Sequence, residues 1–144
     1  MLRGLHTRIG FDGGRFDVSF VSPKNHILKV EVKWDKKAAE SGRVFFEFLN
    51  TRQKKPSGVA CTDADWWCQV LGTGERALLM PVPWLRDFLQ SSNFKQVNTR
   101  GADSNSKGYV VPLPNLLKEK EARRINLPTL DDYFGLLVKQ SLTP

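Results

Sequence analysis

The segment His26–Lys37, HILKVEVKWDKK, alternates apolar and charged residues over the length of one β-strand. Successive side chains of a strand point to opposite faces of its sheet. A strand here therefore has one wholly apolar face and one face that carries three charges, those of Lys29, Glu31 and Lys33. A solvated sheet edge fits this pattern, and so does an active site built on a rigid strand.

The segment before it predicts that this strand is one half of a β-hairpin. Phe16, Val18 and Phe20 alternate with polar residues, and SPKN at 22–25 supplies the turn. Runs rich in aromatic and β-branched residues predict four further strands, at about 43–50, 66–71, 75–82 and 109–113.

Helix signals are fewer. Thr62 or Asp63 is expected to cap a short helix before the strand at 66–71, and Pro83 to begin a longer helix. A last helix is expected from about Thr129, where Asp132 suggests a capping arrangement. The whole pattern predicts a mixed α/β fold, a central sheet of four to five strands flanked by helices.

The chain length of 144 residues suits one domain, residues 1–144. We expect its core at about 15–113, followed by a C-terminal helical extension at about 114–144. No apolar run approaches the roughly 18 residues of a membrane span, and the N-terminus lacks the apolar segment of a secretory signal. The two cysteines, Cys61 and Cys68, are expected to be reduced, buried thiols, which favours a cytoplasmic protein without a membrane partner.

The net charge of +7 is unevenly distributed along the chain. Residues 1–60 hold 12 Lys and Arg against 6 Asp and Glu, whereas residues 61–144 hold 10 against 9. The positive excess therefore coincides with the charged strand. A basic surface attracts polyanions, of which nucleic acid is the commonest, although a basic domain with no such partner fits equally well.

Two carboxylates can meet on the predicted hairpin. Asp17 shares the polar face of its strand with Ser19, so pairing of the two strands brings it towards Glu31. Two close carboxylates repel each other unless a cation lies between them, and Mg²⁺ is the hard cation that prefers oxygen ligands. Lys33 would then stabilise negative charge or assist deprotonation of a water. This set suits hydrolysis of a phosphodiester.

Asp17, thirteen intervening residues and then Glu31-Val32-Lys33 resemble the signature of the PD-(D/E)XK nuclease superfamily. This superfamily includes restriction endonucleases, Holliday-junction resolvases and many phage endonucleases. The later segments SGRVFFEF, KKPSGVACTDADWW and GADSNSKGYVVPL resemble successive blocks of its small phage-type branch. The resemblance covers about residues 15–113.

The resemblance implies a restriction-endonuclease-like core and cleavage of DNA that depends on Mg²⁺ or Mn²⁺. Asp17, Glu31 and the Val32 carbonyl would hold the metal, and Lys33 would be the catalytic base or charge stabiliser. Two features depart from the family pattern. Phe16 stands where proline is usual, and residues 1–30 contain no glutamate that could serve as a ligand on a first helix.

Further residues are candidates for the same site. Glu47 would orient Lys33 or reach the metal through a water, Asp12 would replace Asp17 if the strand began earlier, and Thr62 and Asp65 are expected to act as caps. The expected phosphate contacts, for which a solvated basic surface is the alternative, are Arg52, Lys54, Lys55, Ser57, Arg100 and Lys107.

Three functions follow from these features. The first is a metal-dependent endonuclease, phage- or mobile-element-encoded, acting on duplex or branched DNA in the cytoplasm of its host. The others are a non-catalytic nucleic-acid-binding module with the same fold, and a basic interaction or inhibitor protein. A homodimer is possible through the apolar side chains of the expected C-terminal helix, Tyr133, Phe134, Leu136 and Leu137.

Overall fold

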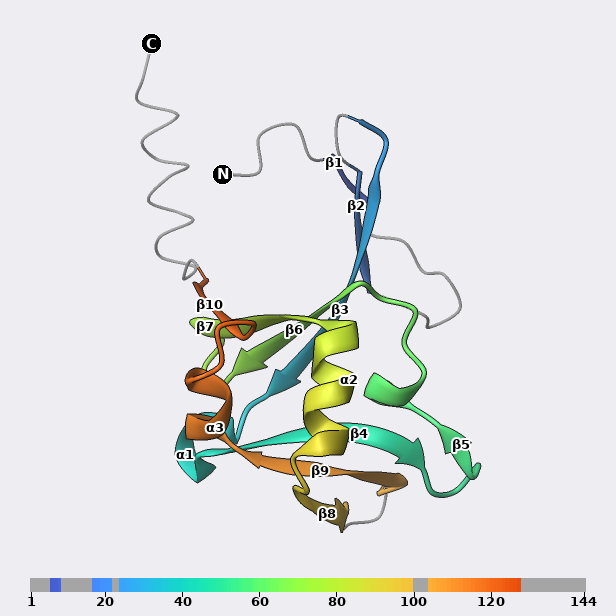
Figure 1. Cartoon of the computed structure of the whole chain (residues 1–144), viewed down its shortest axis with the longest axis vertical. Coiled ribbons are helices and arrows are strands. Elements are labelled where there is room, and N and C mark those ends of the chain that lie inside the picture. The colour runs from blue at the N-terminus through green and yellow to red at the C-terminus, as the bar shows by residue number, and fades with distance from the viewer. Residues whose placement is uncertain (1–5, 9–16, 22–23, 100–103, 128–144) are drawn as a thin grey trace.

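The computed structural model describes residues 6–8, 17–21, 24–99 and 104–127, which form a mixed α/β fold with two β-sheets (Figure 1). The first sheet has six strands, in the order β1 (His6–Arg8), β2 (Val18–Val21), β3 (Ile27–Asp35), β6 (Trp66–Leu71), β7 (Arg76–Pro81) and β10 (Arg123–Asn126). Only β3 and β6 pair in parallel in this sheet. The second sheet is antiparallel, in the order β5 (Lys55–Pro56), β4 (Arg43–Asn50), β9 (Ser106–Pro112) and β8 (Lys95–Asn98).

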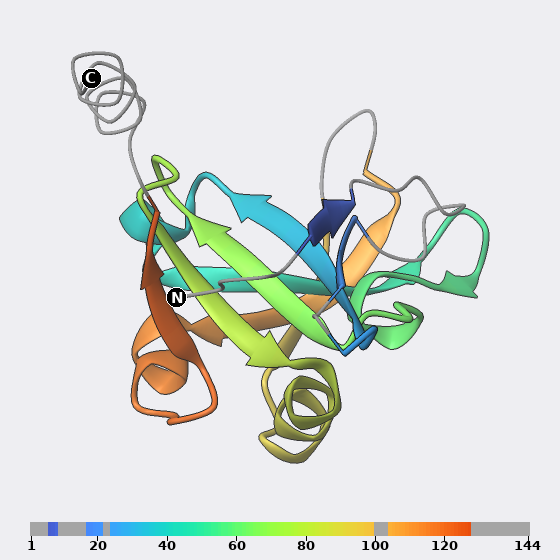
Figure 2. The same cartoon turned by 90° about the horizontal axis from the view of Figure 1, so that it is seen from above.

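Four short helical segments complete the described part of the chain. They are α1 (Ala38–Ser41), the 3₁₀ helix η1 (Gly58–Ala60), α2 (Val82–Ser91) and α3 (Leu113–Leu117). The strands of the first sheet cross over β4 and β9, and α2 lies along one side of both sheets (Figure 2). Buried residues of both sheets and of α2 and α3, among them Phe46, Trp67, Met80, Leu85 and Leu116, form one hydrophobic core.

The α/β class and the hairpin are confirmed. β2 pairs antiparallel with β3, with Ser19 opposite Lys29, and α2 begins one residue before Pro83. The prediction of one central sheet was wrong, because β4 lies in the second sheet with β9. The aromatic pattern at 43–50 indicates a buried strand, but it does not indicate which strand it pairs with. The restriction-endonuclease-like form of the core stays a prediction.

The structure differs from the local expectations at three places. No helix follows Thr62: its Oγ accepts a hydrogen bond from Ala64 N, and η1 precedes it. The stretch between the helix at Pro83 and the strand expected at 109–113 contains a further strand, β8. The start of the expected C-terminal extension holds the short α3 and then β10, which pairs with β7, while the helix expected from Thr129 lies outside the described residues. β8 and β10 have four residues each and are largely polar, so they carry little apolar periodicity.

The charged face of β3 turns inward. Parallel pairing places Glu31 beside Trp67 and Lys33 beside Gln69, and Trp67 and Gln69 are both buried. The apolar face is exposed towards its ends, where Leu28 is 38% and Trp34 57% exposed, whereas Val30 between them is buried. The expected alternation is therefore confirmed, but the charges lie on the side of the second sheet. This orientation contradicts a simple solvated edge.

Asp35 joins the end of β3 to the start of β4. Its carboxylate accepts hydrogen bonds from Lys37 N and Phe45 N, both at 3.2 Å. α1 fills the connection and ends at Gly42, which has φ +64 and so adopts the left-handed conformation that glycine favours. Asp35 thereby links the end of β3 in the first sheet to the start of β4 in the second sheet, two residues after Lys33.

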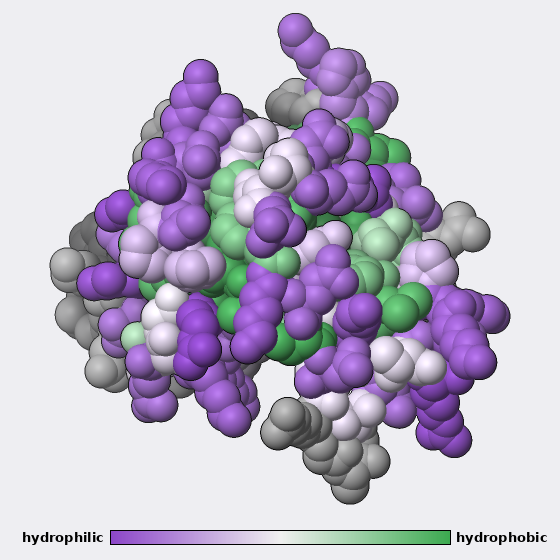
Figure 3. Space-filling view, turned by 60° about the horizontal axis from the view of Figure 1, so that its bottom comes forward, coloured by the Kyte–Doolittle hydropathy of each residue, from purple (hydrophilic) through white to green (hydrophobic). Residues whose placement is uncertain are grey.

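The described surface agrees with part of the composition argument. No helix among the described residues is long and apolar enough to cross a membrane. Hydrophilic residues cover most of the face seen in Figure 3, and hydrophobic ones appear in its middle. Both cysteines are free, as expected, but they are not buried: Cys61 is exposed and Cys68 is half-buried.

Candidate active site

Glu31 and Lys33 form an ion pair along β3. Lys33 Nζ lies 2.8 Å from Glu31 Oε1, and the two side chains are 47% and 9% exposed. The lysine therefore reaches solvent, whereas the carboxylate is held inside the fold above Trp67. Surface ion pairs contribute little to stability, but a buried carboxylate depends on its partners.

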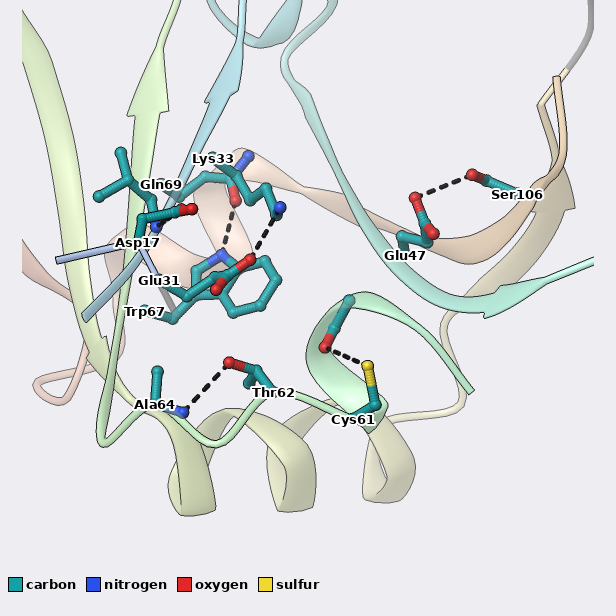
Figure 4. Close-up of polar contacts among 12 residues, drawn as sticks. Asp17, Glu31, Lys33, Glu47, Cys61, Thr62, Ala64, Trp67, Gln69 and Ser106 are labelled. Atoms are coloured by element: carbon teal, nitrogen blue, oxygen red, sulfur yellow. Dashed lines mark hydrogen bonds and ion pairs between the residues drawn. The ribbon is translucent and has the colours of Figure 1, made fainter. Parts of the chain in front are cut away.

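Asp17 lies directly before β2 and is exposed. Its main-chain N donates to Val30 O at 3.1 Å, and its Oδ2 accepts a hydrogen bond from Val32 N at 2.8 Å. The hairpin therefore carries the carboxylates of Asp17 and Glu31 beside the same stretch of β3, as the sequence predicts. Figure 4 shows both near Lys33, beside Trp67 and Gln69.

Glu47 of β4 lines the same cavity as Lys33, and its carboxylate points to Ser106 (Figure 4). The pairing of β4 with β9 shifts by one residue between Glu47 and Leu49, which is the mark of a β-bulge. Bulges re-aim the side chains beside them. Here Glu47 Oε2 accepts a 2.8 Å hydrogen bond from Ser106 Oγ of β9 (Figure 4). The bulge and Ser106 thus fix the direction of a half-buried carboxylate.

The segment from 58 to 62 supports Glu47 from the other side. Gly58 has φ +52, and a Cβ there would lie 2.3 Å from Glu47 O, so only glycine fits at this contact. Arg86 of α2 holds the segment in place: its Nε donates to Val59 O and its Nη2 to Thr62 O, at 2.8 and 2.7 Å. The glycine of the Lys-Pro-Ser-Gly block is therefore the residue whose backbone packs against the main-chain oxygen of Glu47.

Three carboxylates act on Lys33. Burial taken alone lowers the pKa of Lys33, but the hydrogen bond and charge of Glu31 and the weaker charges of Asp17 and Glu47 outweigh it. The net result is a pKa above the ordinary value of 10.5. Lys33 is therefore an ammonium at neutral pH, and all three predicted acidic residues lie within electrostatic range of it.

Lys33 and Glu47 also line one cavity of about 460 Å³, with Gln69 and Trp67 in the same wall. The cavity continues along the end of β3 to Trp34, Lys36 and Lys37. It is open to solvent and large enough for a nucleotide-sized group. The predicted catalytic lysine is thus accessible from outside, unlike its partner Glu31.

Cys61 borders the same group of residues. Burial raises the pKa of its thiol, and the charges of Glu31 and Glu47 raise it further, while Arg86 acts in the opposite direction. The thiol is therefore neutral at pH 7. A protonated thiol is a weak nucleophile and a poor metal ligand, so Cys61 adds no chemistry of this kind to the site.

The predicted phosphate contacts lie at the far end of β4. Arg52, Lys54 and Lys55 are exposed in the loop and short strand that follow it. Thr51 N donates a hydrogen bond to Asn105 O. This bond joins the basic loop to the start of β9, and Lys107 is the second residue of that strand. Ser57 differs from them, because its Oγ is buried and has no hydrogen-bond partner in the described residues.

The other candidates have structural roles or lie outside the described residues. Asp65 joins two strands, since its Oδ2 accepts from Lys29 N and its main-chain N donates to Lys29 O. Thr62 shapes the turn before β6. Asp12, Arg100 and the expected C-terminal helix with its dimer contacts lie outside the described residues.

The donor set fits a magnesium site better than a zinc site. In the described ranges, no three His, Cys, Asp or Glu side chains are grouped closely enough to form a metal site by themselves. Mg²⁺ needs fewer protein ligands, because it keeps several waters and uses one or two carboxylates. Asp17, which precedes β2, and Glu31 of β3 supply two such carboxylates beside the same stretch of β3. The role of the Val32 carbonyl stays a prediction.

Comparisons of this chain with protein-family models, with curated proteins and with solved structures gave no match.

Ser106, Gln69 and Trp67 belong to the site although the sequence did not single them out for it. Ser106 lies in a polar stretch with several similar residues, so nothing in the sequence distinguishes it. Gln69 accepts a 2.8 Å hydrogen bond from Trp67 Nε1, and both are buried beneath the ion pair. A polar residue at an inward position of β6 was the available signal, because buried polar groups require partners.

Proposed function

We propose that this protein is a divalent-metal-dependent endonuclease that hydrolyses DNA phosphodiester bonds. The observation that carries the proposal is the 2.8 Å ion pair of buried Glu31 with solvent-accessible Lys33, beside which Asp17 is held by its hydrogen bond from Val32 N. The resemblance to the PD-(D/E)XK signature supports the same function.

Asp17 and Glu31 would hold the metal, Mg²⁺ or Mn²⁺. When bound, the ion supplies charge neutralisation at the phosphate and activates a water. Lys33 acts as an ammonium, because its pKa is raised above the ordinary value. It would neutralise the negative charge that develops on the phosphate and donate a hydrogen bond to the attacking water, but it would not accept a proton from that water. Glu47, fixed by Ser106, orients Lys33 through its charge or accepts a hydrogen bond from a water.

We expect a DNA strand to lie along β4, because cations stand before and after this strand in the sequence. Lys36 and Lys37 precede its first residue, Arg43, and the basic loop follows its last residue, Asn50. Seven residue steps at roughly 3.3 Å give about 23 Å, the axial length of about seven base pairs. Glu47 lies within β4 and lines one cavity with Lys33, so a DNA strand that follows β4 would bring a phosphate to this cavity.

The experiment is a cleavage assay with duplex, nicked and branched DNA in Mg²⁺ or Mn²⁺. We expect products that require the metal and disappear in Lys33→Ala, while DNA binding in EDTA persists. Asp87→Asn, a charge change at an exposed position of α2, is the matched control and should cleave as wild type. Metal-independent products, or products that persist in Lys33→Ala, would refute the proposed mechanism.

One observation favours a second function, a DNA-binding module without catalysis. Asp17 and Glu31 already have protein partners, Val32 N and Lys33 Nζ, so neither needs a metal to be satisfied. The same assay separates the two functions. Binding that weakens steeply between about 50 and 200 mM salt, without products from any substrate, would favour the module.

A further inference from the structure

Trp34 is a large aromatic side chain held rigidly at the protein surface. It is 57% exposed, yet its indole Nε1 donates a 2.9 Å hydrogen bond to Gly72 O. Gly74 lies beside the ring as well, since a Cβ at Gly74 would be 3.8 Å from Trp34 Cζ2. Single exposed hydrophobic residues are ordinary in proteins. A tryptophan whose edge is anchored and whose ring stays open to solvent is a more specific arrangement.

The surroundings of Trp34 are cationic and continuous with the candidate active site. Lys36 Nζ lies 4.8 Å from the centre of the ring. The cavity that contains Lys33 and Glu47 is also lined by Trp34, Lys36 and Lys37. The lining of this cavity therefore joins Lys33 to Trp34, Lys36 and Lys37 around the end of β3, although the side chains of Lys33 and Trp34 point to opposite faces of the strand. An aromatic ring beside clustered cations suits a base joined to a phosphate.

We propose that Trp34 is a stacking platform for an unpaired nucleobase of the DNA substrate, with Lys36 and Lys37 contacting the adjoining phosphates. This inference rests on the proposed function, because it assigns the neighbouring phosphate to Lys33. Aromatic side chains stack on any base, so the platform carries no sequence preference. A base within a duplex is already stacked on both sides. The substrate class is therefore DNA with an unpaired nucleotide beside the cleaved bond, as in flaps, frayed ends and branches.

The test measures binding without metal, so it does not depend on cleavage. The full chain, in EDTA, is titrated into a fluorescein-labelled 12-nucleotide single strand and into a blunt duplex that contains the same strand, with anisotropy as the readout. We expect Trp34→Leu to weaken single-strand binding about tenfold and to leave duplex binding within twofold of wild type. Trp34→Phe keeps an aromatic face and should retain most of the affinity.

Trp66→Leu is the matched control. Trp66 lies on the same outward face of the sheet, but its side chain is half-buried and does not line this cavity. We expect its single-strand affinity to equal that of wild type. Circular dichroism spectra establish that each variant is folded.

The inference is overturned if wild type does not bind the single strand, if folded Trp34→Leu binds it as well as wild type does, or if single-strand and duplex binding fall equally. If the protein cleaves no DNA but its single-strand binding depends on Trp34, this inference holds and only the proposed function fails. If the protein cleaves DNA but its single-strand binding does not depend on Trp34, the proposed function holds and this inference fails.

Discussion

Lys33 Nζ lies 2.8 Å from Glu31 Oε1, yet the lysine is half exposed and the glutamate is almost fully buried. The two residues therefore depend on each other unequally. Lys33 can be solvated by water if Glu31 is lost, whereas Glu31 left without Lys33 is a charge inside the fold. This asymmetry leads to the first prediction.

Lys33→Met should destabilise the protein more than Glu31→Gln does. An orphaned buried acceptor costs about 1–3 kcal/mol, whereas the glutamine amide still accepts from Lys33, and its loss of charge should cost less than about 1 kcal/mol. Urea unfolding at pH 7 measures both. The double variant should be more stable than Lys33→Met alone, because no unpaired charge remains. Equal costs for the two single variants would contradict the asymmetry.

The stability of the pair should decrease at alkaline pH. The folded-state pKa of Lys33 is raised above 10.5, so the folded protein binds more protons than the unfolded chain in this range. The contribution of Lys33 is fully present below about pH 10.5 and is lost as the pH rises through the folded-state pKa. Denaturant unfolding at pH 8, 9.5 and 11 should show the stability gap between wild type and Lys33→Met shrinking at the highest pH. A gap that widens would mean that the pKa is lowered.

Gly58→Ala should be more destabilising than Gly42→Ala. Both glycines have positive φ, +52 and +64, so both variants pay the left-handed penalty of roughly 1–2 kcal/mol. Only at Gly58 would the new Cβ also meet a backbone atom, Glu47 O. Thermal or urea unfolding should therefore show an excess loss of more than about 1 kcal/mol for Gly58→Ala. Equal losses would mean that the segment moves away from β4 at little cost.

Ser106→Ala and Ser57→Ala should behave oppositely. Ser106 Oγ donates to Glu47, so its loss should cost about 1 kcal/mol and lower metal-dependent cleavage about tenfold by releasing that carboxylate. The buried Ser57 Oγ has no partner in the described residues, so its removal should leave stability unchanged or slightly raised. Unfolding and initial cleavage rates measure both effects. Unchanged cleavage in Ser106→Ala would remove Glu47 from the site.

How much of this site follows from the sequence depends on the distance over which each signal acts. The period of two in β3 predicts that Glu31 and Lys33 share a face, and the SPKN turn predicts the hairpin that carries Asp17 to them. Those are local consequences of strand geometry. The sequence does not indicate that this charged face turns inward, because the apolar face with Val30 and Val32 is the one expected to face the core.

The parts of the site that depend on contacts between distant segments could not be predicted from the sequence. Glu47 lines the cavity with Lys33 because β4 lies in the second sheet and carries a bulge. Neither feature has a periodic signal in the sequence. Ser106 is one of several similar residues in its segment, and only the register of β9 against β4 selects it. Trp34 reads as an apolar-face residue, whereas its exposure depends on how the end of β3 meets Gly72.

The central claim, that the charged end of the hairpin holds a divalent cation, is tested most directly by Mn²⁺ binding, with electron paramagnetic resonance counting the free ion. We predict saturable binding to wild type and to Asp87→Asn, weakened at least tenfold in both Asp17→Asn and Glu31→Gln. No saturable binding to wild type, or unchanged binding in these two variants, would contradict the claim.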